Sequence, residues 1–215
     1  MRLVDSHAHL QADAFDSDRP GVVASAAVAG VERLLVPGWD LESSRRAVAL
    51  AVASAADATP LAVDAAAGIH PHAAAGANGA TWEAIRALVA LPSVLAIGET
   101  GLDYDREFSP RPAQLDNVRR HLQLGRDTGK PVILHCRSAA GRRDAHDDLI
   151  AELRRAGAGD PAWVARLRGR PPAILHSFSG PPDYAEAAMA LGLAVSFSGL
   201  VFRRGEAASA EVVRL

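Results

Sequence analysis

The sequence predicts an α/β protein built as a (β/α)₈-type barrel, in which parallel strands alternate with helices. Seven short aliphatic runs are separated by segments of helical periodicity, as expected for repeated βα units. No glycine-rich phosphate loop follows the first run, which disfavours the open doubly wound sheet. Histidines and a glutamate end several runs, and barrel enzymes collect their catalytic groups at those ends.

The expected elements follow from this alternation. We expect strands at residues 3–9, 33–37, 63–70, 94–99, 131–136, 173–177 and 193–197. Helix starts are indicated by Pro20, Asp40, Thr81 and Pro182, and helix ends by Gly30, Gly129 and Gly192. Residues 157–172 are rich in Gly, Pro and Arg, which predicts a long connection before the sixth strand.

We expect residues 1–215 to form a single domain, because no repeat or linker divides the chain. A barrel of this type has eight strands, whereas the pattern gives seven, and residues 205–215 indicate the start of the helix after the seventh. The expectation is therefore a barrel truncated after strand 7, with unpaired edges on the first and last strands. A fragment of a longer gene product is the favoured explanation, and a naturally truncated form is the alternative.

Composition narrows the class of partner. The chain has 215 residues, with 23 Lys and Arg against 25 Asp and Glu, and a net charge of -2. A protein that binds duplex DNA along an extended groove is usually strongly basic, so the net charge of this chain disfavours such a groove. The charge is compatible with a small active site that acts on the end of a nucleic-acid strand. One cysteine, no bilayer-length apolar run and no secretory signal predict a cytoplasmic protein without membrane contact. We also expect a monomer.

The strongest local pattern is a pair of histidines, His7 and His9, at the end of the first expected strand. Side chains two residues apart on a strand share a face, so two imidazoles can bind one metal ion. Glu99 ends a buried run, where a carboxylate needs a partner or a metal. His135 and His176 each follow an Ile-Leu pair at a strand end. Each residue alone also fits a structural hydrogen bond or ion pair, but together they form a two-metal ligand set.

A pair of divalent ions in such a set predicts a hydrolase. Two ions about 3.5 to 4 Å apart activate water near neutral pH and stabilise both the attacking and the leaving oxygen. Imidazole-rich ligation suits Zn, Mn, Fe or Ni better than Mg. The expected cofactors are therefore two divalent metal ions, with Glu99, His135 and His176 as the expected catalytic groups.

Six ordered segments carry a resemblance to a known family. They are DSHAHL at 5–10, GIHPH at 68–72, AIGETGLDY at 96–104, KPVILHCR at 130–137, HSFSG at 176–180 and FSGL at 197–200. In this order they resemble the motifs of the TatD family of metal-dependent deoxyribonucleases. The resemblance implies an amidohydrolase-superfamily barrel that cleaves DNA phosphodiesters, often from a strand end. It also implies that His7 and His9 hold the first metal, that Glu99 bridges, and that His135 and His176 hold the second.

The sequence departs from that family at one point. Its members have an eighth strand that ends in an acidic motif of the type Glu-Thr-Asp, whose aspartate binds the first metal and serves as the expected general base. No residue here matches that aspartate, and Asp183 and Glu211 are poor substitutes because both fall on expected helices. An intact metal pair without this base predicts weak activity.

Four further residues are candidate substrate contacts. His70 and His72 could hydrogen-bond a phosphate, or simply stabilise their own loop. Asp103 could orient a ligand histidine or cap the next helix. Arg137 follows His135 by two positions and could clamp a phosphate or make an ion pair. Cys136 alternates away from the expected metals, which argues against a thiol nucleophile.

Two other functions stay open. The same scaffold could hydrolyse an amide or ester of a small molecule, and the substrate could equally be a small phosphoester. Related enzymes with a lysine bridge on strand 4 are disfavoured, because the only lysine, Lys130, precedes strand 5. The chain could instead be an inactive, metal-binding remnant.

Overall fold

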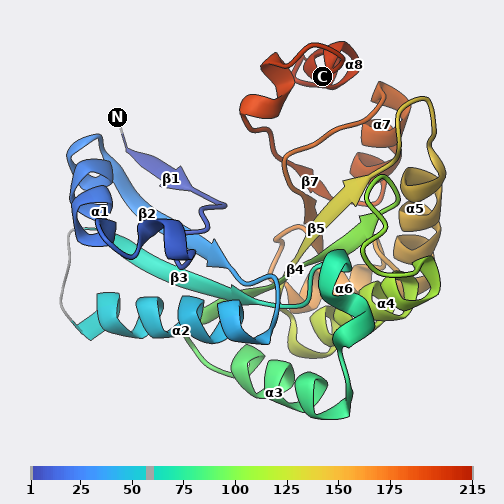
Figure 1. The fold of residues 1–215 in the computed structure, drawn as a ribbon. Helices are drawn as coiled ribbons and strands as arrows, with labels where there is room; N and C mark the ends of the chain where they lie inside the picture. Colours follow the sequence, from blue (N-terminus) through green and yellow to red (C-terminus); the bar gives the residue numbers. More distant parts are fainter. Residues whose placement is uncertain (1, 57–60, 215) are drawn as a thin grey trace. The chain divides into compact units, whose positions relative to one another are not determined.

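The structure is a computed structural model that describes residues 2–56 and 61–214 (Figure 1). Contacts within the chain divide it into two compact units. The first unit covers residues up to Ile69 together with Ala77–Glu99, and the second covers His70–Gly76 together with the residues from Thr100 onward. The fourth strand, β4, runs from Val94 to Asp103 and so contributes its first part to one unit and its second part to the other.

The first unit is a parallel sheet with helices packed against it. Strand β1 pairs with β2, β2 with β3, and β3 with the start of β4, all in parallel register. Helix α2 runs alongside β3 (Figure 1). The elements of this unit before β4 are β1 (Leu3–Asp5), η1 (Asp13–Phe15), α1 (Arg19–Val28), β2 (Val31–Pro37), α2 (Leu41–Ala56), β3 (Ala62–Ala67) and α3 (Gly79–Val89).

The second unit continues the same alternation. Strand β5 pairs with β6, and β6 with β7, again in parallel. Its elements besides β4 are η2 (Pro71–Gly76), α4 (Arg111–Thr128), β5 (Val132–Arg137), α5 (Asp144–Ala156), α6 (Pro161–Arg166), β6 (Ala173–Leu175), α7 (Pro182–Ala190), β7 (Ala194–Val195), η3 (Gly199–Phe202) and α8 (Ala207–Val212).

Each unit has a core made by the strands and the inward faces of its helices. In the first unit Ala65, Ala66 and Ala67 of β3 are fully buried, and small side chains on α2, such as Ala47, let that helix approach the sheet closely. In the second unit large aliphatic side chains fill the core, for example Leu134 of β5. Burying one such side chain stabilises the fold by about 1.5 to 3 kcal/mol.

All seven expected strands are present, but several boundaries differ. Pro20, Asp40 and Pro182 lie at helix starts, and Gly30, Gly129 and Gly192 follow helix ends with positive φ, as expected. Two expectations were wrong. Thr81 is not the start of α3, because Asn78 is its N-cap and accepts a hydrogen bond from the Thr81 N–H at 3.0 Å. The connection 157–172 contains a helix, α6, with Asp160 as N-cap and Pro161 as its first residue.

No helix in the described part of the chain is both long enough and apolar enough to cross a bilayer.

The buried His121 predicts a pH-dependent stability. It lies on α4, where its Nδ1 is 2.8 Å from the Asn117 carbonyl oxygen, and burial lowers its pKa to about 4. The unfolded chain binds this proton near pH 6.5, so stability is complete above that pH and is lost as the pH falls towards 4. Between pH 7.5 and pH 5 the expected loss is about 2 kcal/mol.

Urea unfolding of the wild type and of His121→Leu at these two pH values measures this term. The variant has no imidazole at position 121 and so does not bind this proton. Between pH 7.5 and pH 5 its free energy of unfolding should therefore fall by about 2 kcal/mol less than that of the wild type. Equal pH dependence in the two proteins would contradict the assignment.

Candidate metal centre

The first unit brings three of the predicted ligands together. His7 and His9 were expected on the first strand, but β1 ends at Asp5 and both histidines lie in the segment after it. Asp5 Oδ1 accepts a hydrogen bond from the His7 N–H at 3.0 Å, which forms a local turn, while the Ala8 N–H still donates to the Leu35 carbonyl of β2 at 3.0 Å and holds the segment beside the sheet. Their side chains nevertheless converge, together with Glu99 of β4.

The three ligand atoms have the spacing of donors around one metal ion. His7 Nε2 lies 3.3 Å from His9 Nε2 and 3.2 Å from Glu99 Oε2, and His9 Nε2 lies 3.6 Å from the same carboxylate oxygen. In a tetrahedral zinc site with bonds of about 2.0 to 2.1 Å, neighbouring ligand atoms are about 3.3 Å apart. The chain therefore holds histidine and carboxylate groups that could bind metal.

Backbone contacts orient these ligands. His9 Nδ1 lies 3.2 Å from the Pro37 carbonyl oxygen and donates to it, which leaves the Nε2 lone pair for a metal. Burial, the largest influence, lowers the pKa of His9, and so favours the neutral imidazole that binds metal. Glu99 is 3% exposed, and its N–H donates to the Gly38 carbonyl at 2.7 Å. A buried carboxylate beside two imidazoles is consistent with a metal ligand.

Sequence reasoning missed one residue of this cluster. Gln11 is buried, and its Nε2 donates to the Pro37 carbonyl oxygen at 2.7 Å, the same oxygen that His9 contacts. It therefore fixes the acceptor that orients His9. The signal was the continued spacing of two residues from His7 through His9 to Gln11.

The second unit holds the remaining candidates around the carboxylate of Asp103. This residue ends β4 and is 1% exposed. Its Oδ2 accepts from His72 Nε2 at 2.7 Å and lies 3.4 Å from His135 Nε2, while its Oδ1 accepts from the backbone N–H groups of Asp105 and Arg106. Burial acts to raise the pKa of Asp103, but these hydrogen bonds outweigh it and hold the pKa below its usual range.

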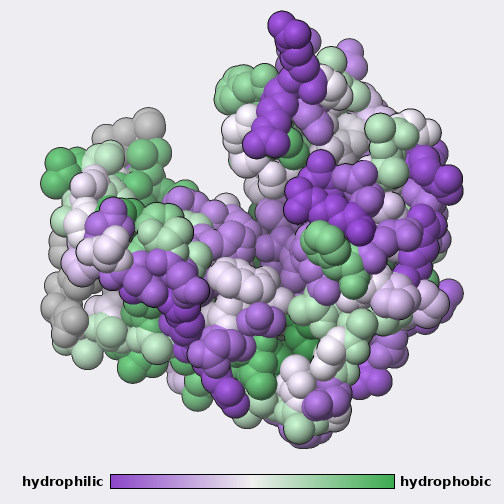
Figure 2. All heavy atoms as spheres, in the orientation of Figure 1, coloured by the Kyte–Doolittle hydropathy of each residue, from purple (hydrophilic) through white to green (hydrophobic). Residues whose placement is uncertain are grey.

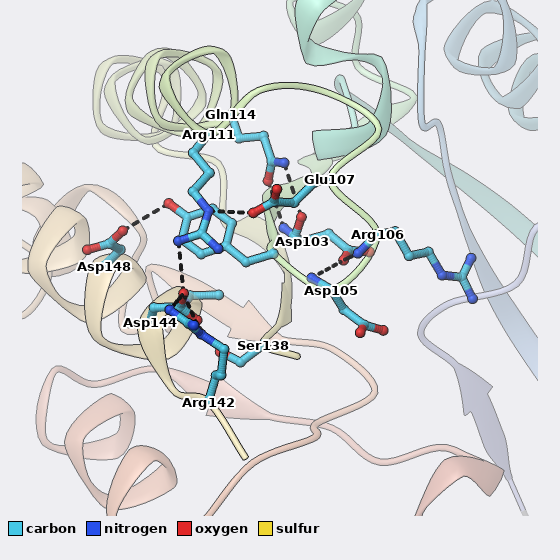
Figure 3. A network of polar contacts seen from close by, with 12 residues as sticks. Asp103, Asp105, Arg106, Glu107, Arg111, Gln114, Ser138, Arg142, Asp144 and Asp148 are labelled. Atoms are coloured by element: carbon cyan, nitrogen blue, oxygen red, sulfur yellow. Dashed lines mark hydrogen bonds and ion pairs between the residues drawn. The ribbon is translucent and has the colours of Figure 1, made fainter. Parts of the chain in front are cut away.

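Asp103 does not cap the next helix, which was one of its two expected roles. Helix α4 begins eight residues later with Pro110 at its N-cap position. Instead, Gln114 of α4 reaches back, accepting from the Asp103 N–H at 2.8 Å and donating to the Asp103 carbonyl at 3.1 Å (Figure 3). Arg111 donates to Glu107 and Asp144 and lies over the Tyr104 ring, so the loop after β4 is held on several sides.

Four histidines of the second unit lie in a connected group. The rings of His70 and His135 have centroids 4.6 Å apart, those of His70 and His72 are 4.3 Å apart, and those of His135 and His176 are 5.8 Å apart. His70 Nδ1 accepts from the His72 N–H at 3.2 Å, which in the neutral ring leaves the proton on Nε2. His70 can therefore donate a hydrogen bond from Nε2.

Arg137 and Cys136 occupy the end of β5. Arg137 Nε makes an ion pair with Asp105 Oδ2 at 2.9 Å, the alternative that spacing alone had left open.

Burial raises the pKa of the Cys136 thiol to about 12, and the Tyr184 hydroxyl contacts it. A thiol with so high a pKa is a poor nucleophile at neutral pH.

The predicted metal ligands thus come from both units. His7, His9 and Glu99 belong to the first, and His135 and His176 belong to the second. The complete five-ligand centre stays a prediction.

Comparisons with known proteins decide the family. A family model described as TatD related DNase matches residues 4–215. The chain belongs to this family. Curated relatives named 3'-5' ssDNA/RNA exonuclease TatD, from Edwardsiella piscicida and Escherichia coli strain K12, are each 36% identical over 205 residues. These alignments cover 94% of this chain and 71% and 70% of the respective relatives. The resemblance inferred from the motifs is confirmed.

Solved structures agree with this TatD assignment. The YjjV TatD homologue of Escherichia coli superimposes with a TM-score of 0.77 at 28% identity, covering 99% of this chain and 74% of that one. A TatD family hydrolase of Entamoeba histolytica gives a TM-score of 0.80 at 20% identity, covering 96% of this chain and 68% of that one, which supports the fold. The predicted barrel-type α/β fold is therefore confirmed, with seven parallel strands in the described residues.

Proposed function

We propose that this TatD family member is a metal-dependent hydrolase that cleaves phosphodiester bonds at the end of a single-stranded nucleic acid. The observation that carries the proposal is the convergence of His7, His9 and Glu99 at metal-ligand spacing, in a chain whose relatives are named as exonucleases on single-stranded DNA and RNA. The near-neutral net charge of -2 favours contact with a strand end over an extended duplex groove.

In this proposal five side chains hold two divalent ions. His7, His9 and Glu99 would hold one ion, His135 and His176 would hold the other, and Glu99 would serve both. Bound divalent ions supply a water-derived nucleophile near neutral pH and stabilise negative charge on the attacking and leaving oxygens. The imidazole donors suit Zn, Mn, Fe or Ni, and Mg is the oxygen-preferring alternative.

The neighbouring residues position ligands and substrate. Asp103 contacts both His72 and His135, so we assign it the role of fixing the orientation of His135. His70 donates from Nε2 to a phosphate oxygen, and His72 extends the same polar wall. Arg137 contributes a guanidinium whose charge is partly neutralised by Asp105. The enzyme acts as a cytoplasmic monomer in this proposal.

Metal removal and restoration test the function. The purified chain is stripped with a chelator, reloaded separately with Zn, Mn, Ni, Fe or Mg, and given 5'-labelled and 3'-labelled single-stranded DNA and RNA. We expect cleavage to fall to background on stripping and to return with at least one ion, because charge stabilisation by metal amounts to several kcal/mol of the barrier. Elemental analysis should give up to two ions per chain, and the two labels report the direction of digestion.

A second panel separates the competing functions. It contains small esters, amides and phosphoesters, with duplex DNA for comparison. Hydrolysis of a small amide or ester without nuclease activity would contradict the proposal in favour of a small-molecule hydrolase. Stoichiometric metal binding without any hydrolysis would contradict it in favour of a metal-binding remnant.

A further inference from the structure

A polar pocket lies in the second unit, bounded by the segments that follow β4, β5, β6 and β7. Its volume is about 540 Å³, within the range of small-ligand sites. Polar side chains that line it include Arg137, Ser138, Arg142, Ser179, Arg204 and Glu206. Residues 204–209, which run from the end of η3 into α8, supply one wall, and Figure 2 shows hydrophilic and hydrophobic side chains side by side over this end of the chain.

The guanidinium groups of this pocket outnumber its carboxylates. Arg137 is paired with Asp105. Arg142 Nη2 lies 3.0 Å from Asp144 Oδ2, but Arg111 also donates to that oxygen at 2.8 Å, so Asp144 is shared. Figure 3 shows Arg142 beside Ser138 and Asp144.

Arg204 supplies the unbalanced positive charge. It is exposed and makes no ion pair within the described part of the chain. The nearby carboxylate of Glu206 is instead occupied by hydroxyl groups, accepting from Ser179 Oγ at 3.0 Å and from Ser209 Oγ at 2.6 Å. An anion that enters the pocket therefore meets Arg204 and the part of the Arg142 guanidinium that does not contact Asp144. Guanidinium groups bind phosphate oxygens strongly.

The pocket begins where the candidate ligands of the second unit end. Arg137 follows His135 by two residues on β5, and Ser179 follows His176 by three residues after β6. A phosphodiester chain whose reacting phosphate lies at these histidines would carry its neighbouring phosphate towards the pocket. A pocket of this charge fits the backbone of the substrate, and no Phe, Tyr or Trp side chain of the described residues lines it for a base to stack on.

We propose that this pocket is a subsite for a backbone phosphate of single-stranded DNA or RNA, next to the phosphate that is cleaved. Arg142 and Arg204 are its main phosphate contacts. The inference rests on the proposed nuclease function and adds to it a determinant of substrate length, because a substrate too short to place a phosphate in the pocket gains nothing from it.

The test uses the double variant Arg142→Gln/Arg204→Gln. Binding of a fluorescein-labelled ten-nucleotide oligothymidylate is measured by anisotropy in EDTA over a series of KCl concentrations, with an oligouridylate of equal length as the RNA arm. We expect about 10-fold weaker binding, as for the loss of a charge-assisted hydrogen bond. The slope of log K against log salt should fall by about 0.7 for each lost phosphate contact.

A matched variant controls for net charge. Arg154→Gln/Arg155→Gln removes the same two charges from exposed positions at the other end of α5 and should bind the oligonucleotide like the wild type. Both substituted positions of the test variant are exposed, and Asp144 retains Arg111, so the fold should be kept. Equal thermal midpoints by circular dichroism check this.

The outcomes separate the pocket from the reaction. Unchanged affinity and salt slope in the test variant, or an equal loss in the control variant, would overturn the subsite. With metal restored, the test variant should lose more kcat/KM on a ten-nucleotide substrate than on a dinucleotide, and equal losses would also overturn it. Because the binding assay excludes metal, pocket-dependent binding by a chain that never cleaves would refute the proposed hydrolysis alone.

Discussion

Glu99→Gln is expected to lower nuclease activity at least about 1,000-fold while leaving the fold intact. The carboxylate contacts both His7 and His9, at 3.2 and 3.6 Å, and the proposal makes it the ligand shared by both metal ions. A neutral amide is a much weaker metal ligand. Losing about 4 kcal/mol of the charge stabilisation that metals supply corresponds to about three orders of magnitude in rate.

The substitution should not destabilise the metal-free protein. Glu99 is buried, and a buried carboxylate carries a desolvation penalty that its imidazole neighbours only partly offset. Glutamine has nearly the same shape and no charge. We therefore expect the thermal midpoint of metal-free Glu99→Gln to equal or exceed that of the wild type.

The measurements are kcat/KM on single-stranded DNA, metal content and thermal unfolding of the same preparations. Asp103→Asn is the comparison with a smaller expected effect. Replacing a residue that orients a metal ligand typically lowers metal affinity or activity by about 10- to 100-fold. The shared-ligand role of Glu99 is refuted by a variant that retains both the metal stoichiometry and the activity of the wild type. A large loss of thermal stability would show instead that Glu99 is primarily structural.

The sequence was sufficient for most of the fold because its signals are local. Aliphatic runs gave all seven strands, and Asp40, Pro182 and Gly129 each act at a helix end through their own backbone or side-chain geometry. Helix α6 was missed because its start signals, Asp160 and Pro161, lie in a Gly- and Pro-rich stretch that resembles a loop in composition.

The residues of the candidate site could be predicted from the sequence, but their positions and partners could be predicted only in part. Counting along β1 placed His7 and His9 on a strand, whereas β1 ends at Asp5 and the Asp5 side chain accepts a hydrogen bond from the His7 N–H. Alternation placed Arg137 on the face of His135, but it could not reveal Asp105, its partner on another loop. The polar pocket was also invisible, because segments far apart in the sequence form it.

Gly101→Ala is expected to lower the stability of the second unit by about 3 kcal/mol or more. Gly101 lies in β4 with φ of 135°, a region that residues with a Cβ rarely adopt. An added Cβ would lie 1.9 Å from the His135 carbonyl oxygen and 2.8 Å from its carbonyl carbon. These are backbone atoms of the adjacent strand β5, so no side-chain rotation can relieve the overlap.

Relief therefore requires β4 and β5 to separate where β5 carries His135. A loss of about 3 kcal/mol corresponds to a thermal midpoint lower by about 6 to 12 °C in a protein of this size. Because His135 moves with its backbone, metal affinity should fall as well, even below the melting temperature of the variant.

Gly79→Ala provides the matched control for this substitution. Gly79 begins α3, nothing lies within 4 Å of the position that an alanine methyl group would take, and alanine is the better helix former, so stability should be unchanged or slightly higher. Thermal unfolding by circular dichroism and metal titration of both variants make the comparison. If Gly101→Ala melts within about 2 °C of Gly79→Ala and binds metal equally well, then β4 and β5 do not approach as closely as the structure indicates. The close approach matters for function because it sets the position of His135 through the main chain. A side chain at residue 101 would press on the backbone of His135 and so displace the imidazole that is proposed to bind metal.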